Sequence, residues 1–152
     1  MKFIKNPSVF ISVLGAYVAA ILYPWVTGFM FLATLNFFIL LIGFTYRQKD
    51  QRKHALLMTL GIVSDLAIVL TLQVQRNAVA SAIAFKLSAL NQAHIFCSTS
   101  ATVLYFPMIY LGYQLIQKKS GPQTKTLHRK LGYATLILRG LGFFLMFSML
   151  KL

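Results

Sequence analysis

The sequence has almost no acidic residues: it contains no glutamate and only two aspartates, Asp50 and Asp65, among 152 residues. Paired-carboxylate acid–base catalysis, calcium sites and two-metal phosphoryl-transfer sites need several carboxylates together, so this chain cannot supply them alone. Cys97 is the only cysteine, which excludes an intrachain disulfide and a cysteine-based zinc cluster. The sequence also lacks a phosphate-binding glycine loop, a zinc-protease motif and a Ser-His-Asp arrangement. We therefore expect that the protein is not an enzyme.

Charged residues are scarce and apolar residues abundant, at 11% and 58% of the chain. A soluble domain carries roughly 25% charged residues, so this composition indicates a membrane protein. Five apolar segments leave no soluble domain outside them: 8–23, 29–46, 54–75, 88–116 and 131–150. Because about 20 helical residues cross a bilayer, we expect an all-α integral membrane bundle of five transmembrane helices. A four-helix core over 29–150 and an N-terminal helix over 8–23 would form one membrane domain, 1–152.

The basic residues are distributed unevenly between the two sides of this predicted bundle. If every segment spans, eleven lie on the side of the loop 47–53: Lys2, Lys5, Arg47, Lys49, Arg52, Lys53, Lys118, Lys119, Lys125, Arg129 and Lys130. Only Arg76, Lys86 and Lys151 lie on the other side, which predicts a cytoplasmic N-terminus and an external C-terminus. Residues 1–23 also fit a cleaved signal peptide, whose removal would leave four helices in the same orientation. Because the basic residues lie between apolar runs, we expect contact with the lipid bilayer and no nucleic-acid partner.

Two ionisable residues fall inside predicted spans, where a charge is costly and needs a partner. Asp65 lies eleven residues after His54, and Arg139 lies eleven residues after His128. Eleven residues bring a helix to within about 20° of whole turns, so each pair shares a face, roughly 16 Å apart along the axis. Both helices start on the same side, so Asp65 and Arg139 lie at the same depth. We expect an intramembrane ion pair, and a polar relay or a cofactor-facing pair is the alternative.

The predicted helices that begin near His54 and His128 both start on the side of the loop 47–53, whereas His94 lies near the opposite side. Two histidines at similar depth on neighbouring helices are a ligand set for b-type haem or for copper. Four basic residues beside them suit haem propionates: Arg52, Lys53, Arg129 and Lys130. The simpler alternative is that each histidine lies hydrated at the membrane interface.

His94 and Cys97 lie three residues apart on one predicted helix face. An imidazole and a thiol at this spacing suit a soft metal such as copper, or the handling of haem. The alternative is that Cys97 packs as a small apolar residue.

Several motifs have a familiar order along the chain. The run from Asn36 to Gly43 is followed by a basic loop and by His54-Ala55-Leu56-Leu57-Met58. His94 with Pro107, and then His128-Arg129-Lys130-Leu131-Gly132, continue the pattern. This order resembles a bacterial family of small four-helix membrane proteins that includes assembly factors for haem–copper cytochrome oxidases. The resemblance covers about residues 29–150.

The chain departs from the family pattern in two places. The family has a second histidine near the end of the third apolar segment, where this chain has Gln73, Gln75 and Arg76. Asp65 stands where the family has a small residue such as serine. If the family uses one histidine pair at each membrane face, the pair opposite the loop 47–53 is incomplete here.

The resemblance implies a factor for the assembly or maturation of a respiratory haem–copper oxidase in the bacterial inner membrane. Such a factor binds haem, copper or an oxidase subunit, and His54 and His128 would be its primary ligands. Two other functions stay open: a non-enzymatic accessory subunit of a larger membrane complex, such as a terminal oxidase, and a small b-type electron-transfer cytochrome. For an accessory subunit, small residues offer a surface for close helix packing: Gly15, Ala16, Ala19 and Ala20.

Overall fold

The computed structural model describes residues 28–76, 87–118 and 121–147, together with single residues at positions 7, 11, 12, 15 and 80. Four α-helices account for most of these residues: α2 (Gly28–Thr45), α3 (Gln51–Arg76), α5 (Ala89–Ile116) and α6 (Pro122–Met146). The described residues contain no strand, which confirms the all-α class predicted from composition.

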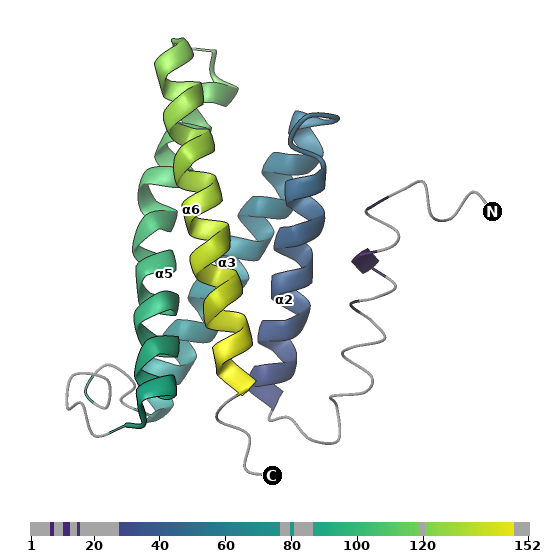
Figure 1. Ribbon diagram of the computed structural model, residues 1–152. Coiled ribbons are helices and arrows are strands. Elements are labelled where there is room, and N and C mark those ends of the chain that lie inside the picture. Colours follow the sequence, from purple (N-terminus) through teal and green to yellow (C-terminus); the bar gives the residue numbers. More distant parts are fainter. Residues whose placement is uncertain are drawn as a thin grey trace. The chain divides into compact units, whose positions relative to one another are not determined.

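The chain divides into two compact units, each built on a helical hairpin. The first unit comprises residues 1–79 and 150–152, and in it α3 packs against α2. The second unit comprises residues 80–149, and in it α6 packs against α5 (Figure 1). Each hairpin has a short connection, so its two helices run antiparallel.

Three of the helices are long and apolar enough to cross a membrane: Gly28–Thr45, Gln51–Leu72 and Ala89–Ile116. These three helices could span a membrane, in agreement with the predicted membrane protein, but the predicted count of five transmembrane helices is not supported. Helix α6 carries Lys125, His128, Arg129 and Lys130 in its first turns, so its apolar stretch begins only at Leu131. The predicted N-terminal helix over 8–23 lies outside the described residues, apart from positions 11, 12 and 15.

The helix boundaries extend the predicted segments at their polar ends. The predictions for α2 and α5 agree with the structure to within one residue, but α6 begins at Pro122 rather than at residue 131. Proline at the first position of a helix loses no hydrogen bond, because that N–H has no partner inside the helix. His128 therefore lies between one and two turns inside α6 and does not open the helix.

Helix α5 has defined signals at both ends. The Ser88 hydroxyl accepts a hydrogen bond from the backbone N–H of Asn91, at 3.4 Å, and caps the first turn. At the other end Lys118 adopts a left-handed conformation with φ of 54°, and its N–H donates to the carbonyl of Leu115. A left-handed residue just after the last turn redirects the chain and ends the helix.

Glycines set the distance between α2 and α3. A Cβ added at Gly43 would lie 3.0 Å from the Cβ of Leu57 and 3.3 Å from the backbone nitrogen of Met58. One added at Gly61 would lie 2.5 Å from a methyl carbon of Leu40. The two backbones therefore approach closely at two levels of the hairpin, which small residues allow in membrane helices.

The α5–α6 hairpin uses glycines in the same way. A Cβ at Gly142 would lie 2.6 Å from the hydroxyl of Ser98, and one at Gly132 would lie 3.3 Å from the terminal carbon of Met108. One at Gly112 would lie 3.4 Å from the imidazole of His128. In each of these three contacts the numbers of the two residues have the same sum, as expected when two antiparallel helices keep one register along their length.

We predict that Gly43→Ala destabilises the first unit. Neither the Cβ of Leu57 nor the backbone of Met58 moves unless α3 moves, so the added methyl group separates the helices. We expect a loss of about 1–3 kcal/mol, typical of overpacking, measured as a lower unfolding temperature in detergent. Gly28→Ala is the matched control because a Cβ there meets nothing within 4 Å. Equal unfolding temperatures for the two variants would show that the close approach does not limit stability.

Candidate functional site

His54 is oriented by a hydrogen bond between the two helices of the first unit. Its Nδ1 lies 2.9 Å from the carbonyl oxygen of Gly43, in the last turn of α2. A carbonyl oxygen only accepts hydrogen bonds, so Nδ1 carries the proton and donates it. In the neutral imidazole Nε2 then holds the lone pair, which is the atom that ligates a metal. Metal-binding histidines are commonly oriented by such a bond to a backbone carbonyl.

His94 has the same arrangement in the second unit. Its Nδ1 lies 2.7 Å from the carbonyl oxygen of Gly142, across the interface between α5 and α6. The same reasoning assigns the proton to Nδ1 and the lone pair to Nε2. Cys97 is a free, half-buried thiol one turn further along α5. The two predicted soft-metal ligands thus lie on one helix, with the imidazole fixed by its neighbour.

His128 lies on the other helix of this hairpin, near the opposite end. It is half-buried, and its ring occupies the space that the absent side chain of Gly112 leaves on α5. Arg129 and Lys130, which follow it, are exposed. The three histidines therefore share one feature: each lies against a glycine of the partner helix in its own hairpin.

The pairing of His54 with His128 stays a prediction, because the two residues belong to different units. Within the described part of the chain, no three His, Cys, Asp or Glu side chains group together as a metal site. A complete ligand set from one unit is therefore not found among those residues, and His94 with Cys97 supplies two ligands only.

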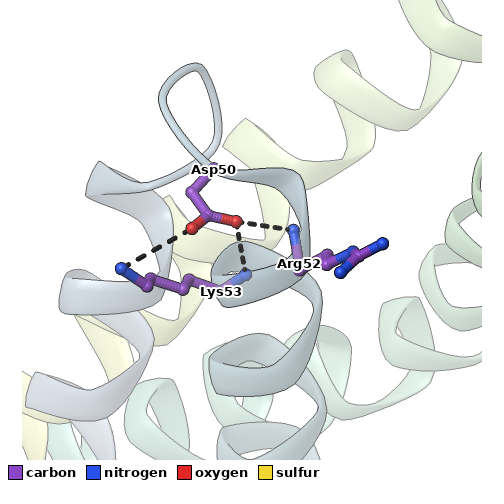
Figure 2. Close-up of polar contacts among 3 residues, drawn as sticks. All are labelled: Asp50, Arg52 and Lys53. Carbon is purple, nitrogen blue, oxygen red and sulfur yellow. Dashed lines mark hydrogen bonds and ion pairs between the residues drawn. The ribbon is translucent and has the colours of Figure 1, made fainter.

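Asp50 organises the turn that carries His54 (Figure 2). Its carboxylate accepts hydrogen bonds from the backbone N–H groups of Arg52, at 3.0 Å, and of Lys53, at 3.1 Å. The ammonium group of Lys53 lies 3.6 Å from the other carboxylate oxygen. The hydrogen bond from the Lys53 backbone contributes most to lowering the pKa of Asp50 below its ordinary value of 3.8, and the Lys53 charge acts in the same direction. The sequence interpretation missed this cap, although an aspartate just before an apolar helix is a known start signal.

Asp65 and Arg139, the residues of the predicted ion pair, are both buried, with 1% and 8% of their surface exposed. They lie in different units, so their pairing also stays a prediction. Burial of both charges agrees with the need for a partner, since an isolated charge in an apolar interior is costly.

Asn36, the first residue of the run that resembles the family motif, is a buried polar residue. It is 2% exposed, and its amide oxygen lies 3.7 Å from the place of a Cβ on Gly61. Neither polar atom of the amide has a hydrogen-bond partner among the described residues. The amide therefore lies against the face of α3 that carries Gly61 and, one turn later, Asp65.

We predict that the Asp50 cap makes stability depend on pH in the acid range. Because the folded pKa lies below 3.8, the contribution of Asp50 is complete above that value and is lost as pH falls through the folded pKa. The unfolding temperature should therefore fall more steeply between pH 5 and about pH 2.5 in the parent protein than in Asp50→Asn. Asp65 is present in both proteins, so the difference isolates Asp50. If the unfolding temperature depended on pH equally in the two proteins, the Asp50 cap would be excluded as a contributor to stability.

We predict that Asp65→Asn lowers the yield of folded protein and its unfolding temperature, because Arg139 keeps its charge and loses the predicted partner. The double exchange Asp65→Arg with Arg139→Asp should recover part of that loss. Size-exclusion chromatography in detergent and thermal unfolding measure both effects. An Asp65→Asn protein that is as stable as the parent would contradict the pairing.

A comparison of the chain with protein-family models, curated proteins and solved structures finds no match. The resemblance of the histidine motifs to oxidase assembly factors therefore stays a hypothesis, and the function is inferred from the chemistry of the site.

Proposed function

We propose that the protein is an assembly or maturation factor of a respiratory haem–copper oxidase that binds haem through His54 and His128. One observation carries the proposal: the Nδ1 of His54 is committed to the Gly43 carbonyl, at 2.9 Å. The bond leaves Nε2 as the ligating atom and fixes the ring. The motif order around His54, His94 and His128 supplies the link to oxidase assembly.

The residues around these two histidines fit a b-type haem. The neutral imidazoles of His54 and His128 would hold the iron, and exposed cations follow or precede each histidine in the sequence. Arg52, Arg129 and Lys130 are exposed and suit the propionate groups, whereas Lys53, also exposed, already pairs with Asp50. A bound haem would supply a redox-active iron or would itself be the cargo. The role of this chain's own residues is to hold the cofactor at one membrane face.

We place the protein in the bacterial inner membrane with its N-terminus in the cytoplasm. The basic loop between α2 and α3 supports this orientation, because Lys and Arg near spans accumulate on the cytoplasmic side. Histidines His54 and His128 would then act at the cytoplasmic face, and His94 with Cys97 at the outer face, where copper is the second metal to consider.

An accessory subunit of a larger complex is the second candidate, since the large apolar side chains that α5 exposes, such as Phe96, Phe106 and Tyr110, suit a partner helix as well as lipid. The small residues that suggested this function contribute less. Gly15 lies against the ring of Phe38 on α2, inside its own unit, and the other three lie outside the described residues.

We predict that the protein produced with ample haem shows a sharp reduced haem band after dithionite addition. His54→Ala and His128→Ala should each lose the band, because each removes a proposed iron ligand. His94→Ala is the matched control, since it removes a histidine with the same bond to a backbone carbonyl that is not a proposed ligand, and it should keep the band. Folded yield is measured for all variants. A featureless spectrum from folded parent protein would reject haem binding and favour the accessory subunit.

A further inference from the structure

The turn between α2 and α3 is a compact cationic surface. Four basic residues lie within seven positions and surround a single acid, Asp50: Arg47, Lys49, Arg52 and Lys53. Both flanking helices are long and apolar enough to cross a membrane. The turn therefore lies at the membrane boundary, at the depth of the lipid headgroups.

Two of these cations are occupied by contacts within the turn. The guanidinium of Arg47 lies 3.9 Å from the centre of the Phe44 ring and donates a hydrogen bond to the Phe44 carbonyl, at 3.2 Å. Lys53 pairs with Asp50 at 3.6 Å and lies 5.5 Å from the centre of the Tyr46 ring. Lys53 thus compensates the only carboxylate of the turn, and Arg47 is held against Phe44.

The other two cations have a fixed backbone and exposed side chains. The N–H of Lys49 donates to the Tyr46 carbonyl at 3.0 Å, and the N–H of Arg52 donates to the Asp50 carboxylate at 3.0 Å. Both residues are exposed, and neither side chain has an ion pair or hydrogen bond with a described residue. Figure 2 shows the Arg52 guanidinium directed away from Asp50.

We propose that Lys49 and Arg52 form a binding site for the phosphate group of an anionic phospholipid. Arginine presents paired donors to phosphate oxygens and lysine adds a second positive charge. Asp50 does not oppose the anion, because Lys53 compensates its charge at 3.6 Å. Clusters of basic residues next to a span are typical of sites for anionic lipids. The inference rests on the turn alone and not on haem binding.

The test compares two single variants that remove the same charge from the same turn and leave the Lys53–Asp50 pair intact. Arg52→Gln removes a proposed ligand, whereas Arg47→Gln removes a cation that is occupied by Phe44. Native mass spectrometry of the full haem-free chain released from detergent counts bound phosphatidylglycerol. Phosphatidylcholine is the control for binding of a lipid without net charge. Competition with inorganic phosphate shows whether the site binds a free phosphate or the lipid. Unfolding temperatures confirm that both variants are folded.

We expect the first variant to weaken phosphatidylglycerol binding about fivefold and the second to weaken it clearly less. The parent should prefer phosphatidylglycerol to phosphatidylcholine, and inorganic phosphate should not displace the lipid. Equal losses in the two variants would overturn the site, because they would show a diffuse positive potential. Equal binding of the two lipids, or displacement by inorganic phosphate, would overturn the assignment to an anionic lipid.

Discussion

The close approach of two helix backbones at glycine is the constraint on which the site depends. In each hairpin a histidine reaches a backbone carbonyl of the partner helix, His54 to Gly43 at 2.9 Å and His94 to Gly142 at 2.7 Å. A larger residue at either glycine would push the helices apart and lengthen that bond. Helix packing and the tautomer of the histidine are thus linked. The glycine sets the distance between the two helices, and its carbonyl oxygen holds the proton on Nδ1. Nε2 is therefore the nitrogen that is left to bind a metal.

The two aspartates, the only acidic residues of the chain, have different roles. Asp50 lies in the turn outside the spans, where it accepts two backbone hydrogen bonds and compensates Lys53. Asp65 is buried within α3, where a carboxylate is costly without a counter-charge. Because Asp50 is already used, Asp65 is the remaining carboxylate in this chain for Arg139. Most other cations have no acid to pair with, and the membrane surface is the natural source of negative charge.

Hydropathy predicted the lipid-facing parts of the fold well, but not where the helices end. Segments 29–46 and 88–116 match α2 and α5 to within a residue, since both helices are apolar almost to their ends. Helix α6 begins at Pro122, nine positions before the predicted segment, because a helix continues through polar residues that hydropathy does not recognise. The same polar start explains why the predicted fifth span is not supported.

The sequence singled out the candidate site residues but not the contacts that their side chains make. Spacing along one helix places Asp65 beneath His54 and Cys97 beside His94, because a helix has a fixed period. Spacing along one helix carries no information on the register between two helices, so the hydrogen bonds to Gly43 and Gly142 could not be predicted from the sequence. The Asp50 cap is different: it is local and follows from known start signals of helices.

The tautomeric states of the histidines test the central claim most directly. Nitrogen-15 NMR of histidine-labelled protein in detergent, with neutral imidazoles and with signals assigned by single His→Gln variants, distinguishes protonated from unprotonated ring nitrogens. For His54 and His94 we predict a protonated Nδ1 and an unprotonated Nε2, since a carbonyl oxygen faces each Nδ1. A protonated Nε2 with an unprotonated Nδ1 in His54 would contradict both the glycine-dependent bond and the ligand role built on it.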